Sequence, residues 1–169
     1  MACRIPLLCG RPRRGDQQST DMKKNYTRFP LDPPHPAFRK EVAAWMPILQ
    51  VRVGYNHKQT PRMPAVVDSG SPYCFFQSSV AEYLGIDVER GIEDSVGGIT
   101  KGAPEPVYFH KVQVYVEADW IINIMAGFCK KLSVAAILGR NGFFDNFHTQ
   151  FDHSGNPPVL EIRRIERAQ

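Results

Sequence analysis

The chain has 169 residues, of which 43% are hydrophobic and 22% are charged, and its formal net charge at pH 7 is +4. This composition is typical of one globular domain and excludes an intrinsically disordered or fibrous protein. No apolar run approaches the roughly 18 residues that a membrane-spanning helix needs. The cysteines and histidines show neither a disulfide framework nor zinc-ligand spacing. We therefore expect a protein of the reducing cytoplasm that has no membrane association, metal or cofactor.

The positive charge is concentrated near the N-terminus. Residues 1–40 contain nine Lys/Arg and three Asp/Glu, whereas the remaining residues have a net charge of −2. The N-terminal segment is also polar and interrupted by proline, so we predict a basic, mostly disordered extension over 1–40 and a folded domain over 41–169. The extension is expected to be solvated, and contact with RNA, DNA or anionic lipid is the alternative.

After the basic segment, short apolar runs alternate with Gly, Pro and polar turns, a pattern that predicts many short strands and little helix. One short helix is expected over 80–84, capped at its start by Ser78 or Ser79 and ended by Gly85. A second is expected directly after Gly139. Together these elements predict a closed or nearly closed β-structure. The expected strands cover residues 48–53, 63–67, 71–76, 107–116, 121–128, 134–138, 151–152 and 159–162.

Three segments of the chain bear on function. The first is the segment after Ala65–Val67, where a short apolar strand stops at Asp68 and turns at once through Ser69 and Gly70. Asp, Ser and Gly favour tight turns, so a carboxylate is placed at the end of a core strand, facing a cleft. An ordinary strand-to-loop turn with a solvated Asp68 remains the alternative at this point.

The second feature is a glycine-rich segment, 91–102, in which four glycines alternate with Ile, Val and polar residues. This composition indicates a mobile hairpin whose tip is Gly97-Gly98. Further along the chain, Ile137–Asn141 reads Ile-Leu-Gly-Arg-Asn, an apolar strand that ends at a glycine. The acidic turn, the glycine-rich hairpin and this last segment follow one another in that order.

In that order and spacing, the three segments resemble the retropepsin-like (retroviral-type) aspartic protease domain, including its bacterial and cellular relatives. The likeness covers roughly residues 46–165. It implies a mainly β fold, a small closed β-barrel of the retropepsin-like acid protease type with one or two short helices. It also implies an aspartic endopeptidase that acts on peptide or protein substrates.

Such an enzyme holds the hydrolytic water between two carboxylates that share one proton. The chain contains only one Asp-Ser-Gly triplet. The resemblance therefore implies a homodimer in which Asp68 of each protomer meets its twin on the two-fold axis. It further implies that Ser69 braces the two active-site loops across that axis, that Gly70 offers backbone to substrate, and that Ser71 hydrogen-bonds the outer oxygen of Asp68.

A flap that closes over bound peptide and excludes water is also implied. Its residues would be Val96, Gly97, Gly98 and Ile99.

Ile137 and Leu138 would line or back the substrate subsites, and Gly139 would let the chain pass close behind the active-site loop. Many retropepsins pair the arginine that corresponds to Arg140 with an acid four residues after the catalytic Asp. Pro72 occupies that position here. Arg140 therefore needs another partner, or the brace is absent.

Two other interpretations stay open from the sequence. One is a pseudo-protease of the same fold that binds extended peptides without cutting them. The other is an unrelated small β-barrel with a nucleic-acid-binding basic tail, in which Asp68 is a plain turn residue.

Overall fold

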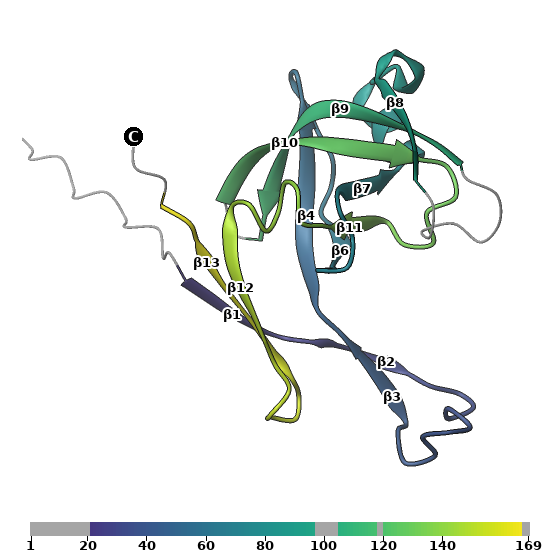
Figure 1. The fold of residues 1–169 in the computed structure, drawn as a ribbon, viewed down its shortest axis with the longest axis vertical. Helices are drawn as coiled ribbons and strands as arrows, with labels where there is room; N and C mark the ends of the chain where they lie inside the picture. The colour runs from purple at the N-terminus through teal and green to yellow at the C-terminus, as the bar shows by residue number, and fades with distance from the viewer. Residues whose placement is uncertain (1–20, 97–104, 118–119, 167–169) are drawn as a thin grey trace, which may run out of the picture.

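The computed structural model describes residues 21–96, 105–117 and 120–166, and within these ranges the chain is mainly β-structure (Figure 1). The described helices are α1 (Ser78–Leu84) and the short 3-10 turn η1 (Val88–Arg90), and neither is long and apolar enough to cross a membrane. The strands are β1 (Asp21–Asn25), β2 (Thr27–Pro30), β3 (Ala43–Met46), β4 (Ile48–Tyr55), β5 (Lys58–Gln59), β6 (Met63–Val67), β7 (Cys74–Gln77), β8 (Ile92–Val96), β9 (Glu105–Val116), β10 (Trp120–Cys129), β11 (Ala136–Leu138), β12 (Phe147–Asp152) and β13 (Val159–Arg164).

The largest sheet closes on itself. Its strand order is β5–β4–β6–β11–β7–β10–β9–β8, and an additional antiparallel pairing joins β4 to β9, from Val51 opposite Val116 to Gly54 opposite Gln113. Strands β4, β6, β11, β7, β10 and β9 therefore form a ring, which confirms the predicted small closed barrel. Closure removes the exposed strand edges that an open sheet would carry.

The barrel interior is filled by alternate residues of its strands. In β9, Val112, Val114 and Val116 are 4%, 0% and 0% exposed, as expected for side chains that share one face of a strand. β10 shows the same alternation from Trp120 to Ile124. Burying each such aliphatic side chain is worth about 1.5–3 kcal/mol, so these inward-facing residues stabilise the barrel.

The first predicted helix is present, but its start differs from the prediction. Helix α1 ends at Gly85, which adopts a left-handed conformation with φ of 75°, as expected. Its N-cap is Gln77, which makes no side-chain capping bond, and both Ser78 and Ser79 lie within the helix. The prediction of a serine cap is therefore wrong, because β7 runs directly into the helix with no turn between them.

The second predicted helix is absent from the described residues that follow Gly139. The chain makes turns over 140–146, and β12 begins at Phe147. Gly142 has φ of 115°, which a right-handed helix does not allow, so helical bonding stops after one turn. The N–H of Phe143 still donates to the carbonyl of Gly139 at 3.2 Å.

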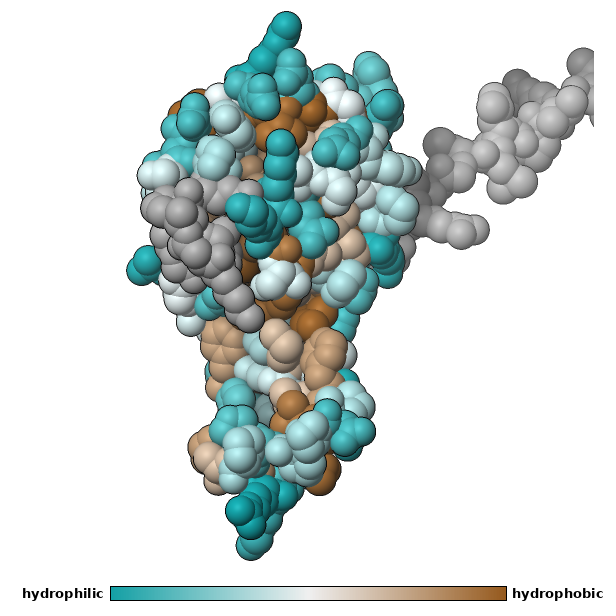
Figure 2. Space-filling view, turned by 90° about the vertical axis from the view of Figure 1, so that its right-hand side faces the viewer, coloured by the Kyte–Doolittle hydropathy of each residue, from teal (hydrophilic) through white to brown (hydrophobic). Residues whose placement is uncertain are grey.

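Two antiparallel units project from the barrel (Figure 1). One is the sheet β1–β13–β12, and the other is the ribbon β2–β3. Residues 21–30 were predicted to be disordered, and this is wrong, because β1 pairs with β13 and Tyr26 is only 5% exposed. Tertiary pairing thus orders a polar segment that has little local strand propensity. Apolar surface lies where the ribbon joins the barrel (Figure 2).

Candidate active site

Asp68 lies at the point where a core strand leaves the barrel. Val67, the last residue of β6, is 3% exposed, and the next residue, Asp68, is half-buried. The backbone N–H of Asp68 donates to the carbonyl oxygen of Leu138 at 3.0 Å, which extends the parallel pairing of β6 with β11 by one residue. The sheet therefore fixes the backbone position of Asp68, while its carboxylate reaches the surface.

The turn that follows orients this carboxylate. The N–H of Gly70 donates to Oδ1 of Asp68 at 2.8 Å, and the N–H of Ser71 donates to the Asp68 carbonyl at 3.2 Å. A Cβ on Gly70 would lie 3.1 Å from the same Oδ1, so a side chain there would crowd the carboxylate. Ser69 and Gly70 are exposed in the single chain. The loop thus presents one oriented carboxylate at an open surface.

Ser71 points away from that surface. Its side chain is 5% exposed, and its hydroxyl donates to the carbonyl oxygen of Tyr73 at 2.9 Å. The expected bond to the outer oxygen of Asp68 is therefore not formed in this structure. The reason is burial: a hydroxyl enclosed beneath the loop needs a nearby acceptor, and the carbonyl of Tyr73 provides it.

The structure brings the segment Ile137–Asn141 directly behind the Asp68 loop. β11 lies between β6 and β7, with Leu138 opposite Val67 in the parallel pairing. Just beyond β11, the N–H of Arg140 donates to the carbonyl of Ser71 at 2.9 Å, and the N–H of Asn141 donates to that of Pro72 at 2.9 Å. Two segments far apart in the sequence are thus joined by backbone hydrogen bonds.

Gly139 lies at the closest approach of these two segments. A Cβ built on it would be 2.1 Å from the carbonyl oxygen of Tyr73 and 2.8 Å from that of Ser71. No side chain fits at these distances, so the requirement for glycine comes from the close backbone approach and not from the turn conformation.

The neighbours of Gly139 differ in environment. Leu138 is 0% exposed and belongs to the main core, whereas Ile137 is half-buried and packs against a smaller apolar cluster that contains Phe75 and Phe109. Arg140 is exposed, and no described residue forms a hydrogen bond or ion pair with its guanidinium group. Their proposed roles in substrate binding or bracing stay predictions.

The flap prediction is covered only in part. β8 pairs antiparallel with β9, from Ile92 opposite Phe109 to Val96 opposite Glu105, so Val96 lies at the end of a hairpin strand. The predicted tip residues Gly97, Gly98 and Ile99 lie outside the described residues.

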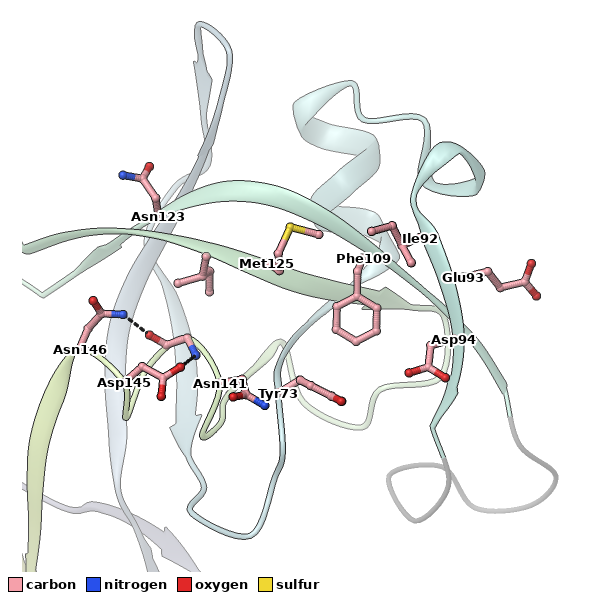
Figure 3. Close-up of a pocket in the computed structure, with 12 residues that line it drawn as sticks. Tyr73, Ile92, Glu93, Asp94, Phe109, Asn123, Met125, Asn141, Asp145 and Asn146 are labelled. Carbon is pink, nitrogen blue, oxygen red and sulfur yellow. Dashed lines mark hydrogen bonds between the residues drawn. The ribbon is translucent and has the colours of Figure 1, made fainter.

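A cavity of about 520 Å³ begins where the Asp68 loop ends (Figure 3). β8 forms one side of it and the turn at residues 141–146 forms another, with side chains of β9 and β10 between them. This cavity has no local signal in the sequence, because its lining residues come from five separate segments. Its lining residues are Tyr73, Ile92, Glu93, Asp94, Phe109, Asn123, Ile124, Met125, Asn141, Gly142, Asp145 and Asn146.

Two further observations concern metal binding and the buried thiol. Within residues 21–96, 105–117 and 120–166, no group of three or more His, Cys, Asp and Glu side chains lies close enough to hold a metal ion. Cys74 is 0% exposed, and burial raises the pKa of its thiol to about 11. A thiol of that pKa is protonated at neutral pH, so Cys74 is not a nucleophile in the folded chain.

No protein-family model and no curated protein matches this sequence. Among solved structures, the chain is similar to a retropepsin-like aspartic protease from Rickettsia conorii, with a TM-score of 0.52 and 12% sequence identity, over 85% of this chain and 92% of that one. It is also similar to the retroviral protease-like domain of Ddi1 from Leishmania major, with a TM-score of 0.37 and 20% identity, over 54% of this chain and 71% of that one. At such low identity, the first likeness concerns the fold alone.

Proposed function

We propose that this chain, which has the fold of the retropepsin-like aspartic proteases, is an aspartic endopeptidase whose catalytic carboxylate is Asp68. The observation that carries the proposal is the geometry of the Asp68 turn. Asp68 is a half-buried residue directly after β6, its carboxylate accepts the N–H of Gly70 at 2.8 Å, and its backbone is supported from behind by β11. An acid fixed in this way, at an open surface, is suited to bind and activate a water molecule.

Peptide-bond hydrolysis of this kind needs a second carboxylate. One carboxylate accepts a proton from the water while the other, protonated, polarises the substrate carbonyl, so the two share one proton and titrate as a pair. The chain has one Asp-Ser-Gly triplet, which favours a symmetric homodimer. The exposed Ser69 and Gly70 would then be covered by the same turn of the partner protomer.

The fold limits how the two protomers can join. β13 is already paired on both sides, by β1 and by β12, so it offers no free edge. A sheet shared between protomers would instead use the outer edge of β1 or of β12, where backbone groups have no strand neighbour among the described residues. This arrangement is part of the proposal.

The test combines sedimentation with cleavage of a mixed peptide library. The wild-type chain should sediment as a dimer and cleave peptides, most strongly at mildly acidic pH and with inhibition by a pepstatin-type inhibitor. Asp68→Asn should keep the dimer and lose cleavage. Asp87→Asn is the matched control, because Asp87 is an exposed acid just before η1 that is paired with Arg90, and this variant should cleave normally. Equal cleavage by Asp68→Asn would remove Asp68 from the mechanism.

A further inference from the structure

We propose that the cavity beside the Asp68 loop is a specificity pocket that takes a lysine or arginine side chain of the bound peptide, with Asp94 as the residue that selects the charge. This inference rests on the proposed peptidase function. Its support lies in the position, the apolar surface and the charge of the cavity.

The position of the cavity links it to the active-site loop. Tyr73, which forms part of its wall, accepts the hydroxyl of Ser71 through its carbonyl at 2.9 Å. Asn141, on the same side, is tied to Pro72 by its N–H at 2.9 Å. The opposite side is β8, one strand of the hairpin that borders the cleft. A peptide extended past Asp68 would therefore place a side chain at the mouth of this cavity.

The cavity offers apolar contact for a long, flexible stem. Ile92 on β8 is 68% exposed and Met125 on β10 is 40% exposed, and both line the cavity. Phe109 lies between them, with its ring 5.2 Å from that of Tyr73 in an edge-to-face arrangement (Figure 3). Lysine and arginine bury their methylene stems along such surfaces while the charged end stays near water or an acid.

The charge of the cavity favours a cation. Its described lining includes acids and amides but no Lys, Arg or His. Asp94, on β8, and Asp145, in the turn at 141–146, lie on different sides of the group of lining side chains (Figure 3). Oδ1 of Asp94 accepts the N–H of Ser95 at 2.7 Å, which helps to orient the carboxylate. A cationic side chain that enters the cavity would pass the apolar side chains of the lining and then reach an acidic one.

One basic residue lies close by on the same sheet face. Lys111 pairs with Met125 across β9 and β10, and it is exposed and not among the residues that line the cavity. It therefore lies near the cavity without forming part of its wall. Lys111→Ala should therefore raise the preference for a basic side chain modestly, since it removes a competing positive charge.

The main experiment compares peptides that differ at a single position. Around a bond cleaved by the wild-type chain, each flanking position is filled in turn with lysine, with its uncharged analogue norleucine, or with glutamate. At one position the kcat/KM for lysine should exceed that for norleucine about tenfold. Asp94→Asn should reduce this ratio to about two, and Asp94→Lys should favour glutamate instead. The ratio cancels any general loss of activity or stability in the variants.

Glu89→Gln is the matched control. Glu89 is exposed on η1, just before β8, and does not line the cavity, so its substitution changes net charge by the same amount. The lysine preference should be unchanged in this variant. A similar loss of lysine preference in Glu89→Gln and Asp94→Asn would indicate a general electrostatic effect. It would overturn the assignment of Asp94 as the residue that selects the charge.

A binding measurement separates this inference from the proposed function. The Asp68→Asn chain, which should not cleave, is titrated with the same fluorescent peptides, and it should bind the lysine peptide about tenfold more tightly than the norleucine peptide. Lysine-selective binding without cleavage by the wild type would reject the peptidase and keep the pocket. Asp68-dependent cleavage without any lysine preference would keep the peptidase and reject the pocket. If the chain showed no binding and no cleavage, the peptidase and the pocket would both be rejected.

Discussion

The carbonyl oxygen of Leu138 accepts the backbone N–H of Asp68 at 3.0 Å, and this bond joins the ends of two parallel strands, β6 and β11. The proposed catalytic residue is thus positioned by a segment far from it in the sequence. The loop depends on this support, because Ser69 and Gly70 are exposed in the single chain. Changes behind the loop should therefore affect the site without touching the carboxylate.

Gly139→Ala should destabilise the fold by about 2–4 kcal/mol, because its Cβ would lie 2.1 Å from the carbonyl oxygen of Tyr73 and the backbone would have to separate. Urea denaturation followed by fluorescence measures this loss. Gly155→Ala is the matched control, since its Cβ meets only the carbonyl of Pro157 at 3.4 Å, and it should change stability by less than about 0.5 kcal/mol. Equal stability of the two variants would contradict the proposed close approach.

Ser71→Ala should lower the free energy of unfolding by about 1–2 kcal/mol, because the buried hydroxyl donates to the Tyr73 carbonyl. The pH dependence of cleavage should stay unchanged, since the hydroxyl does not contact Asp68. The control is Ser79→Ala, an exposed serine on α1, which should leave both stability and the pH profile intact. A shifted pH profile with unchanged stability would instead favour a direct role of Ser71 beside Asp68.

Tyr26→Ala tests whether residues 21–30 belong to the folded domain. Tyr26 is 5% exposed, packs into the main core, and has its ring 5.1 Å from that of His153, so its truncation should cost about 3 kcal/mol. Phe29→Ala is the comparison, because Phe29 is 40% exposed on the projecting ribbon and should cost less than about 1 kcal/mol. Thermal unfolding of both variants measures this difference. A Tm for Tyr26→Ala equal to that of the wild type would indicate that residues 21–30 do not belong to the folded domain.

Cys74 should make stability fall with pH in the alkaline range. Burial raises the pKa of its thiol from 9.0 to about 11, so between these values the unfolded chain loses the proton and the folded chain keeps it. The free energy of unfolding should therefore drop as pH rises from about 9 toward 11, by roughly 2 kcal/mol in total. Urea titrations at several pH values measure this slope, which should be smaller in Cys74→Ala. A thiol reagent that labels Cys74 rapidly in the folded chain at neutral pH would show that the thiol is not enclosed.

Local sequence was sufficient for the elements that place the site. Val66 and Val67 favour an extended strand, and Asp68 to Gly70 favour the turn that ends it, because these preferences act within a few residues. The apolar run 107–116 likewise predicted a strand, which is part of β9, and the glycine at position 85 predicted the end of α1. Of these signals, the turn that begins at Asp68 was also one of the three segments behind the resemblance to retropepsin-like proteases.

The other features of the fold and the site were decided by tertiary structure, because these features depend on contacts between distant segments. The strand β1 exists through its pairing with β13, the hydroxyl of Ser71 turns inward to the nearest enclosed acceptor, and Gly142 breaks a predicted helix. The cavity that includes Asp94 and Asp145 forms only when β8 and a distant turn meet. Local propensity carries no information on such long-range contacts, since the free energy that selects them comes from burial and strand pairing across the whole barrel.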